Sequence, residues 1–309
     1  MKRLCKLFCL LLAMLLLLTA CQATAPDQNT LTRTFTDSTG HAVTVSTTLQ
    51  RVAVLFSSLA DVWTSAGGSI AITVGETVER GIISAENVTL VDDGAGKAIN
   101  VELLIAASPD LVLVSADVPA QTEAAVLLRD AGIPVAELRM ESFSDYLQVL
   151  ETCVYLCGDP IPYQAHGIDQ QRRIDAIVSA KPFAGKRILF IRAGSTARSV
   201  KAKSSTDHFA AAMISELGAV NVADSAPLLL DSLSMEVILR EDPDYVFFTA
   251  MGDEAASRSF VGQLLQQETW QGLTAVQNGN WTFLSKDLFH YKPCSRWADA
   301  YEALASLPI

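Results

Sequence analysis

One phrase occurs twice in this chain, and such a repeat restricts the possible folds more than any other feature of the sequence. The stretches "INVELLIAASPDLVLV" and "LSMEVILREDPDYVFF" each place a Glu ahead of a Pro-Asp pair at the same interval. Glu102 precedes Pro109-Asp110, and Glu236 precedes Pro243-Asp244. Each phrase ends in a hydrophobic run. The chain is therefore expected to contain two copies of one structural plan.

A second pair of runs supports this interpretation. "RVAVLF" begins at Arg51 and "RILFIR" at Arg187, at nearly the same offset as the repeated phrase. Short apolar runs of this kind are typical of buried parallel strands, and a proline ends the helix that precedes the Pro-Asp turn. Helical patterns alternate with these runs, and several end at Gly. The alternation predicts an α/β fold with two Rossmann-like lobes whose sheets are mainly parallel.

Helical periodicity also predicts a connection between the lobes. It continues from the end of the first lobe to the start of the second, broken near Gly158–Pro162. A long linking helix would allow limited hinge motion, and a ligand cleft would lie between the lobes. The expected domains are a signal peptide (1–20), a tether (21–31), an N-terminal lobe (32–160), a linking helix (161–184) and a C-terminal lobe (185–309).

The first 21 residues have the layout of a secretory signal peptide, with basic residues ahead of an unbroken apolar run and small residues at its end. Its last four residues, Leu18-Thr19-Ala20-Cys21, resemble the bacterial lipobox, which implies lipid modification of Cys21. Two or more acyl chains provide stable anchoring. The alternative is an uncleaved transmembrane anchor. In both cases the rest of the protein lies outside the cytoplasmic membrane.

Charge and cysteine content restrict the partners. Without the three basic residues of segment 1–20, 20 Lys and Arg face 34 Asp and Glu, a formal net charge of −14, which argues against nucleic acid. Of the six cysteines, Cys153, Cys157 and Cys294 lie beyond the lipobox. A disulfide framework is not expected. Cys153 and Cys157 share a helical face and are expected to pack as small hydrophobic residues; the alternative, a metal-binding pair, has no neighbouring His.

Ligands of open α/β sheets bind beyond the carboxyl ends of the strands. In the first lobe these positions are Ser57, Ser58 and the segment around Ala116-Asp117. In the second lobe they are the segment 192–205, Met251 with the two residues after it, and the segment 286–293. These segments are expected to meet in the cleft.

The segment 192–205 carries Arg192, Arg198, Lys201 and Lys203 without one acid. In a strongly acidic chain, such a cluster favours an anionic ligand, whose oxygens guanidinium groups can bind in bidentate fashion. The alternative is a solvated loop. Arg192 is the first candidate because it directly follows a predicted strand.

The stretch "LFHYKP" places His290 and Tyr291 together, and both residue types serve as haem axial ligands. Hydrogen bonding and packing within the lobe are the alternative. The four histidines, at positions 41, 166, 208 and 290, show no metal-ligand spacing. We therefore expect no metal site. No set of nucleophile, base and orienting group stands out, so we expect no catalytic residues and no cofactor.

The lipobox, the two α/β lobes and the repeated phrase together resemble the substrate-binding lipoproteins of ABC importers. The resemblance covers roughly residues 32–308 and points to the class with a helical backbone between its lobes, which serves ferric siderophores, haem and cobalamin. It implies that Glu102 and Glu236 project from the lobe tips and pair with arginines of a permease dimer. The alternative is that each Glu is favoured by the dipole at a helix start.

The resemblance implies a monomeric, non-enzymatic receptor that delivers its ligand to an ABC permease dimer with ATPase subunits. The expected ligands, in order, are a ferric siderophore, haem and cobalamin. A metallo-enzyme or chelatase, or a sensory receptor, on the same two-lobed scaffold are the alternatives.

Overall fold

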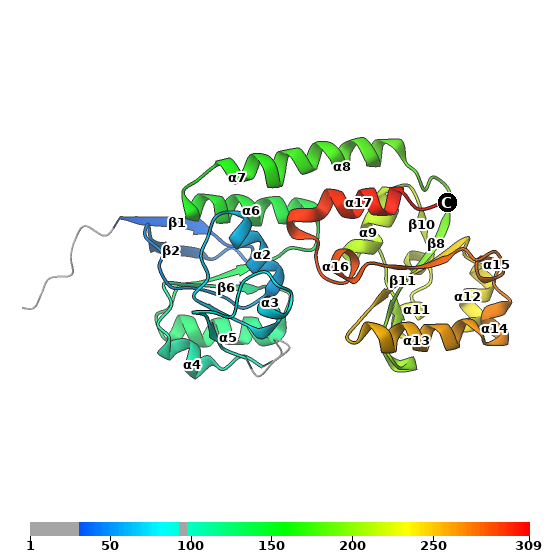
Figure 1. Cartoon of the computed structure of the whole chain (residues 1–309), viewed down its shortest axis with the longest axis horizontal. Coiled ribbons are helices and arrows are strands. Elements are labelled where there is room, and N and C mark those ends of the chain that lie inside the picture. The colour runs from blue at the N-terminus through cyan, green and yellow to red at the C-terminus, as the bar shows by residue number, and fades with distance from the viewer. Residues whose placement is uncertain (1–30, 93–97) are drawn as a thin grey trace, which may run out of the picture.

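The computed structural model describes residues 31–92 and 98–309. They form two α/β lobes that lie side by side, with helices running across both (Figure 1). The predicted signal peptide, Cys21 and nearly all of the predicted tether lie outside the described residues. Within the described ranges, no helix is both long and apolar enough to span a membrane.

The N-terminal lobe is built on a five-stranded sheet in the order β5-β4-β3-β6-β7. Every neighbouring pair in it is parallel. Its strands are β3 (Val52–Val54), β4 (Ile72–Thr73), β5 (Thr89–Leu90), β6 (Leu111–Ser115) and β7 (Val135–Leu138). A separate antiparallel hairpin of β1 (Thr32–Thr36) and β2 (Ala42–Ser46) precedes this sheet.

Five helices accompany these strands: α2 (Ser57–Ser65), α3 (Gly75–Glu79), α4 (Val101–Ala106), α5 (Pro119–Asp130) and α6 (Phe143–Cys157). The ends of α6 show why the sequence folds this way locally. Ser142 and Asp145 form a capping box at its start, and Gly158 takes a left-handed conformation at its end. Cys153 and Cys157 are free thiols on this helix, and both pack in the hydrophobic core, Cys157 at its margin.

The C-terminal lobe repeats the plan with the parallel order β10-β8-β11-β12. Its strands are β8 (Arg187–Ala193), β9 (Val200–Ala202), β10 (Val220–Asn221), β11 (Tyr245–Ala250) and β12 (Trp281–Leu284). Its helices before the last strand are α9 (Phe209–Glu216), α10 (Val222–Ser225), α11 (Leu228–Asp231), α12 (Met235–Glu241), α13 (Glu254–Leu265), α14 (Glu268–Gln271) and α15 (Thr274–Gln277). The prediction of an α/β fold with mainly parallel sheets is confirmed.

The segment 192–205 was expected as a loop after the strand, but part of it forms a second strand. Its strand β9 pairs antiparallel with the end of β8, so that Lys201 lies opposite Arg192. Side chains alternate along this strand: Val200 and Ala202 are buried, while Lys201 between them is exposed. Arg192 and Lys201, as direct cross-strand partners, share one face of the sheet, but Arg192 is largely buried and Lys201 is exposed.

Helices connect the lobes twice. A helical run of α7 (Ile161–Tyr163), the π-helical turn Gln164–Ile168 and α8 (Asp169–Ala180) extends from the first lobe to the second (Figure 1). After β12, α16 (Lys286–Phe289) and the 3₁₀ turn Cys294–Arg296 lead into α17 (Trp297–Ala305), which packs against α8. Arg173 of α8 forms ion pairs with Asp299 and Glu302 of α17.

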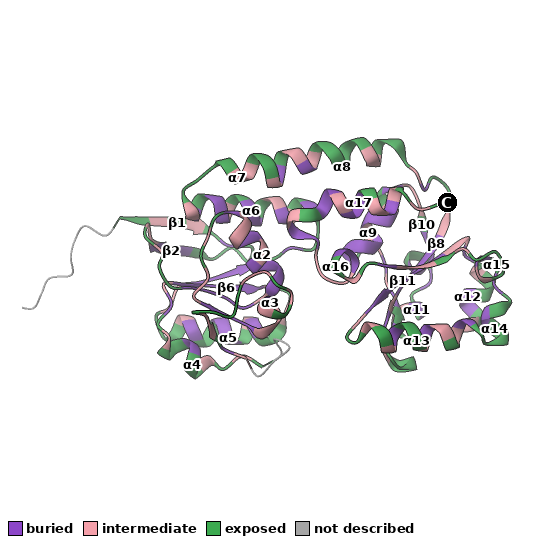
Figure 2. Ribbon diagram, in the orientation of Figure 1, coloured by how far each residue is buried: buried purple, intermediate pink, exposed green. Residues whose placement is uncertain are grey.

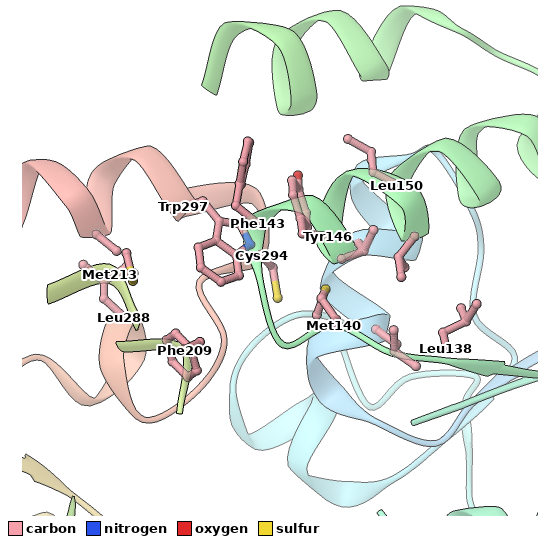
Figure 3. Packing of buried hydrophobic residues seen from close by; sticks show 14 of the residues in the cluster. Leu138, Met140, Phe143, Tyr146, Leu150, Phe209, Met213, Leu288, Cys294 and Trp297 are labelled. Carbon is pink, nitrogen blue, oxygen red and sulfur yellow. The ribbon is translucent and has the colours of Figure 1, made fainter. Parts of the chain in front are cut away.

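One hydrophobic core continues through both lobes and the helices that join them. Trp297 lies near its centre, with ring centroids 5.9 Å from Phe143 and 6.4 Å from Tyr146 of α6 (Figure 3). On its other side the ring of Phe209, from the C-terminal lobe, lies 5.8 Å away. Figure 2 shows buried residues along α6 and α17, whereas much of α8 is exposed. Opening the lobes would expose this core, so the pair is expected to move little.

The Pro-Asp part of the repeated phrase has a structural role. In the N-terminal lobe, Asp110 Oδ2 accepts hydrogen bonds from the backbone N–H groups of Gln50 (2.7 Å) and Arg51 (2.8 Å). The guanidinium of Arg51 donates to the carbonyl of Ala107 at the end of α4. The Asp thus fixes the start of one strand, and the Arg satisfies a free carbonyl at a helix end.

The C-terminal lobe has the equivalent contacts. Asp244 Oδ2 accepts from the backbone N–H of Arg187 (2.8 Å), and the Arg187 guanidinium donates to the carbonyl of Glu241 (3.0 Å) at the end of α12. We call the two sets, Arg51 with Asp110 and Arg187 with Asp244, the strand clamps. They account for the recurrence of Arg and Pro-Asp, but not for the recurrence of the Glu.

Candidate ligand-binding site

A cavity of about 380 Å³ lies between the lobes, at the carboxyl ends of the central strands. The N-terminal lobe contributes hydroxyl and carboxylate groups: Ser57, Ser58, Glu76, Ser115, Asp117 and Glu141. Arg192, Asp207, His208, His290, Tyr291 and Lys292 form the facing wall. Another hollow, of about 200 Å³ beside β12, has no charged side chain in its lining. Convergent polar groups therefore identify the interlobe cavity as the candidate site.

Five of the predicted ligand-binding residues come together here. Ser57 and Ser58 begin α2 directly after β3, and Arg192 lies near the end of β8 that faces the cavity. His290 and Tyr291 follow α16. All five residues lie at the edge of a sheet where parallel strands end. Ligands of such sheets bind at this edge, so the sequence pattern could predict these positions.

Three other predicted residues do not line the cavity. Arg198 is exposed on the 3₁₀ turn Ala197–Ser199, beyond the end of β8. Lys201 is exposed on β9 and is outside the residues that line the cavity. Met251 follows β11 but is outside the residues that line the cavity.

Arg192 is a largely buried cation with incomplete hydrogen bonding. Its Nη2 lies 3.3 Å from Nδ1 of His290. Its Nε is buried and has no hydrogen-bond partner within the described part of the chain. Burial lowers the pKa of Arg192, and the charge of Asp207 partly opposes this. A buried guanidinium with a free N–H is costly unless an anion completes its contacts.

Both histidines of the cavity are held neutral. Burial, with the charges of Arg192 and Lys286, lowers the pKa of His290 to about 4. Burial and nearby cations, Arg192 first among them, lower the pKa of His208 well below its usual value. The His208 ring packs between Phe190 and Phe209, with ring centroids 5.2 and 4.7 Å away.

Arg80, at the end of α3, connects the two walls of the cavity. Its Nη1 donates to Ser57 Oγ (2.8 Å) and Ser58 Oγ (3.3 Å), and Ser57 in turn donates to Glu76 (2.5 Å). Its guanidinium carbon also lies 4.3 Å from the ring centroid of Tyr291, a cation–π contact across the lobes.

Three of the four carboxylates that line the cavity have cationic partners, whereas Glu76 accepts a hydrogen bond from Ser57. Asp117 pairs with Arg139 (3.1 Å), and Asp207 with Lys203 (3.4 Å). Glu141 pairs with Lys292 across the lobes. Within the described residues, Arg192 and Arg80 have no carboxylate at ion-pair distance, so these two cations are available to an anionic ligand.

Sequence reasoning missed several residues of this site: Glu76, Arg80, His208, Glu141 and Lys292. His208 gave a usable signal, since it precedes a helical pattern in "TDHFAAAM" and caps α9. Lys292 was part of the quoted stretch "LFHYKP". Arg80 and Glu76 gave none, because they come from a short helix whose place beside α2 is set by tertiary packing.

Glu102 and Glu236 lie apart from the cavity, each in the first turn of a short helix, α4 and α12. Both side chains belong to exposed residues, and neither takes part in an ion pair among the described residues. The helices lie in the outer parts of the two lobes (Figure 1). A role in docking stays a prediction.

Comparisons with known proteins extend this description. The family model for "Periplasmic binding protein" matches residues 52–288. Among solved structures, a siderophore binding protein, BauB, bound to a complex of ferric iron with two acinetobactin molecules, superposes with a TM-score of 0.72 at 15% identity, covering 90% of this chain and 100% of that one. A search of curated proteins found no match.

Two structures from Vibrio cholerae are also similar. The periplasmic vitamin B12 binding protein BtuF has a TM-score of 0.67 at 18% identity and covers 84% of this chain and 96% of that one. The catecholate-siderophore binding protein VctP has a TM-score of 0.67 at 13% identity, with 89% and 98% covered. At these identities the structures show a shared fold. Since the family model spans most of the sequence, this chain belongs to the periplasmic binding protein family.

Proposed function

We propose that this protein is the lipid-anchored substrate-binding component of an ABC importer and that it captures an anionic iron chelate. Its family is extracytoplasmic, and structures with the same fold include proteins described as binding siderophores and vitamin B12. We rank a ferric siderophore first, haem second and cobalamin third. The chelate would bind in the interlobe cavity and pass to the membrane permease.

Arg192 carries this proposal. It is largely buried at the cavity, its Nε lacks a partner among the described residues, and no described carboxylate lies at ion-pair distance from it. Buried charges are normally paired, so the site is complementary to an anion that the protein itself does not supply.

The proposal includes an anchor and a docking surface. Lipidation of Cys21 would hold the protein at the membrane, and the segment between Cys21 and β1 would act as a tether. Glu102 and Glu236 would each contact one half of a permease dimer, which the ATPase subunits drive. A monomer with two similar lobes suits a partner with two-fold symmetry.

Titration with candidate ligands tests the proposal. The full chain, in detergent, is mixed with ferric catecholate, ferric hydroxamate, haem and cobalamin, and the fluorescence of its four tryptophans is followed. Tight quenching by an anionic ferric chelate is the expected result. Arg192→Gln should weaken binding roughly 10- to 100-fold, because hydrogen bonds to charged groups contribute about 1.5–3 kcal/mol.

Arg198→Gln is the matched control, since Arg198 lies on the same hairpin but outside the cavity. Equal losses in both variants would contradict the placement of the ligand at Arg192. If ligands without a net negative charge, such as a neutral ferric hydroxamate, were the only ones to bind tightly, and if Arg192→Gln left their affinity unchanged, the proposal of an anionic ligand would be contradicted.

A further inference from the structure

The hydrogen-bonding partners of the cavity histidines determine where their protons lie. Nδ1 of His290 is 3.3 Å from Nη2 of Arg192. A guanidinium has only N–H donors, so Nδ1 of His290 must be the acceptor. In a neutral imidazole the proton then lies on Nε2, and this atom is a donor. The pKa of about 4 keeps His290 neutral near pH 7.

His208 has the same arrangement from a different partner. Its Nδ1 accepts a hydrogen bond from the backbone N–H of Ala210, at 3.2 Å. A backbone N–H can only donate, so the proton of neutral His208 also lies on Nε2. Burial and the surrounding cations lower the pKa of His208, which favours this neutral form.

The other nitrogen groups on this side of the cavity are donors too. Arg192 has an unused N–H at Nε, and Lys292 carries an ammonium group. We call Arg192, His208, His290 and Lys292 the donor wall. Two carboxylates lie beside this wall: Asp207 is paired with Lys203, and Glu141 of the facing lobe is paired with Lys292.

We propose that the donor wall binds the outer oxygen atoms of an anionic chelate through N–H groups, with both histidines in the Nε2–H form and no protein ligand to the metal. This rests on the proposed function and specifies its ligand class. The chelate must already fill the coordination sphere of its iron and must present acceptor oxygens to the wall.

Iron ligation by His290 conflicts with the geometry for one reason. A metal on Nε2 would need that nitrogen deprotonated, and the remaining proton would move to Nδ1. There it would face the N–H groups of Arg192 at 3.3 Å, donor against donor. The contact that orients the ring would be lost, and Arg192 would lose a partner. The same argument holds for His208, whose Nδ1 faces the N–H of Ala210.

Nitrogen-15 NMR of the full chain in detergent tests the tautomers without any ligand. With only four histidines, the imidazole signals can be assigned from single substitutions, His290→Gln and His208→Gln. At pH 7 both rings should show a protonated Nε2 and an unprotonated Nδ1. A protonated Nδ1 on His290, or a charged ring, would overturn the proposal.

Two ferric chelates test the mode of binding. A tris-catecholate fills all coordination positions of its iron, whereas a bis-catecholate leaves two of them open to other ligands. If a protein side chain binds the iron of the bis-catecholate, its visible charge-transfer band shifts. The proposal predicts the band of the free chelate in both complexes. His290→Leu should weaken tris-catecholate binding about tenfold, and His290→Gln, which keeps an N–H donor, should recover most of that loss.

A band shift of the bound bis-catecholate that disappears in His290→Gln would show iron ligation and overturn the proposal, while leaving an iron receptor intact. Failure of every chelate to bind the wild-type protein would overturn the proposed function instead. In that case the NMR measurement would still determine the histidine tautomers, because it needs no ligand. Failure of the binding mode and failure of the proposed function can therefore be told apart.

Discussion

The two lobes agree in their framework and differ in the chemistry that they present to the cavity. Both contain a parallel sheet, a strand clamp and an exposed Glu at a helix start. At the cavity, however, the N-terminal lobe offers serines and carboxylates, and the opposite wall offers a guanidinium, an ammonium and two imidazoles. The repeated features stabilise the lobes and are candidates for a symmetric partner. The features that differ give a ligand a fixed orientation.

The largest effect is expected from the pair of exposed glutamates. Glu102→Ala combined with Glu236→Ala should abolish uptake of the chelate in cells and leave its affinity for the purified protein unchanged. Each single variant should retain part of the activity, because one lobe would still dock. Glu123→Ala with Glu268→Ala is the control, since both residues are exposed helix positions. Loss of chelate affinity in the double variant would refute the docking role.

Trp297 tests how firmly the lobes are joined. Trp297→Ala should lower the free energy of unfolding by about 3–5 kcal/mol, the usual cost of removing a buried aromatic ring. Urea denaturation measures this, with Trp281→Ala as control because Trp281 is 40% exposed on an edge strand. The wild-type chain should unfold in one transition; two separate transitions would show that the lobes are independent.

The strand clamps allow a direct comparison between equivalent positions. Asp110 accepts two backbone N–H groups, whereas Asp244 accepts one. Asp110→Ala should therefore cost about 1.5–3 kcal/mol of unfolding free energy, and Asp244→Ala less. The exposed Asp130 provides the control substitution. A larger loss at Asp244 than at Asp110 would contradict the idea that these hydrogen bonds set the stability of each lobe.

The smallest effect concerns pH. His290 has a pKa of about 4 in the folded chain, below its unfolded value near 6.5. The unfolded state therefore takes up the proton first as the pH falls, so stability is present above about pH 6.5 and is lost toward pH 4. One pKa unit corresponds to about 1.4 kcal/mol, so the shift of His290 from near 6.5 to about 4 sets an upper limit of roughly 3 kcal/mol, which partial exposure of the ring reduces.

His290→Gln should flatten the decline between neutral and acidic pH in urea titrations. His166→Gln is the control, because the hydrogen bonds that His166 accepts from Tyr146 and Gln170 are made by its backbone carbonyl. An unchanged pH profile in His290→Gln would mean that other groups, such as His208, account for the acid sensitivity.

Sequence patterns predicted the parts of the molecule that depend on local periodicity. Buried apolar runs marked β3 and β8, and the break at Gly158 separated α6 from the linking helices. Residues expected at strand ends, such as Ser57 and Arg192, do line the cavity because parallel strands end at one edge, although Arg192 lies within the last residues of β8 and not after it. The repeated Glu and Pro-Asp were visible, but the pattern did not show that only the Asp has a structural partner.

The rest of the site depends on contacts between distant segments. Arg80 reaches the cavity only because α3 packs beside α2 and Tyr291 arrives from the other lobe. The excess of cations in the segment 192–205 was real, but Lys201 lies exposed on β9, outside the residues that line the cavity. Charge composition cannot show which of these cations borders the cavity, because that depends on how β9 is placed beside the end of β8.

The hydrophobic core around Trp297, which contains residues of both lobes, has a consequence for how receptors compete for the permease. If the lobes scarcely move, the empty and the loaded receptor present Glu102 and Glu236 at nearly the same spacing, and a permease would accept either. Empty receptors would then compete with loaded ones for the same membrane partners. Import would follow the fraction of receptors that carry cargo, and overproducing the receptor in a chelate-poor medium would slow uptake.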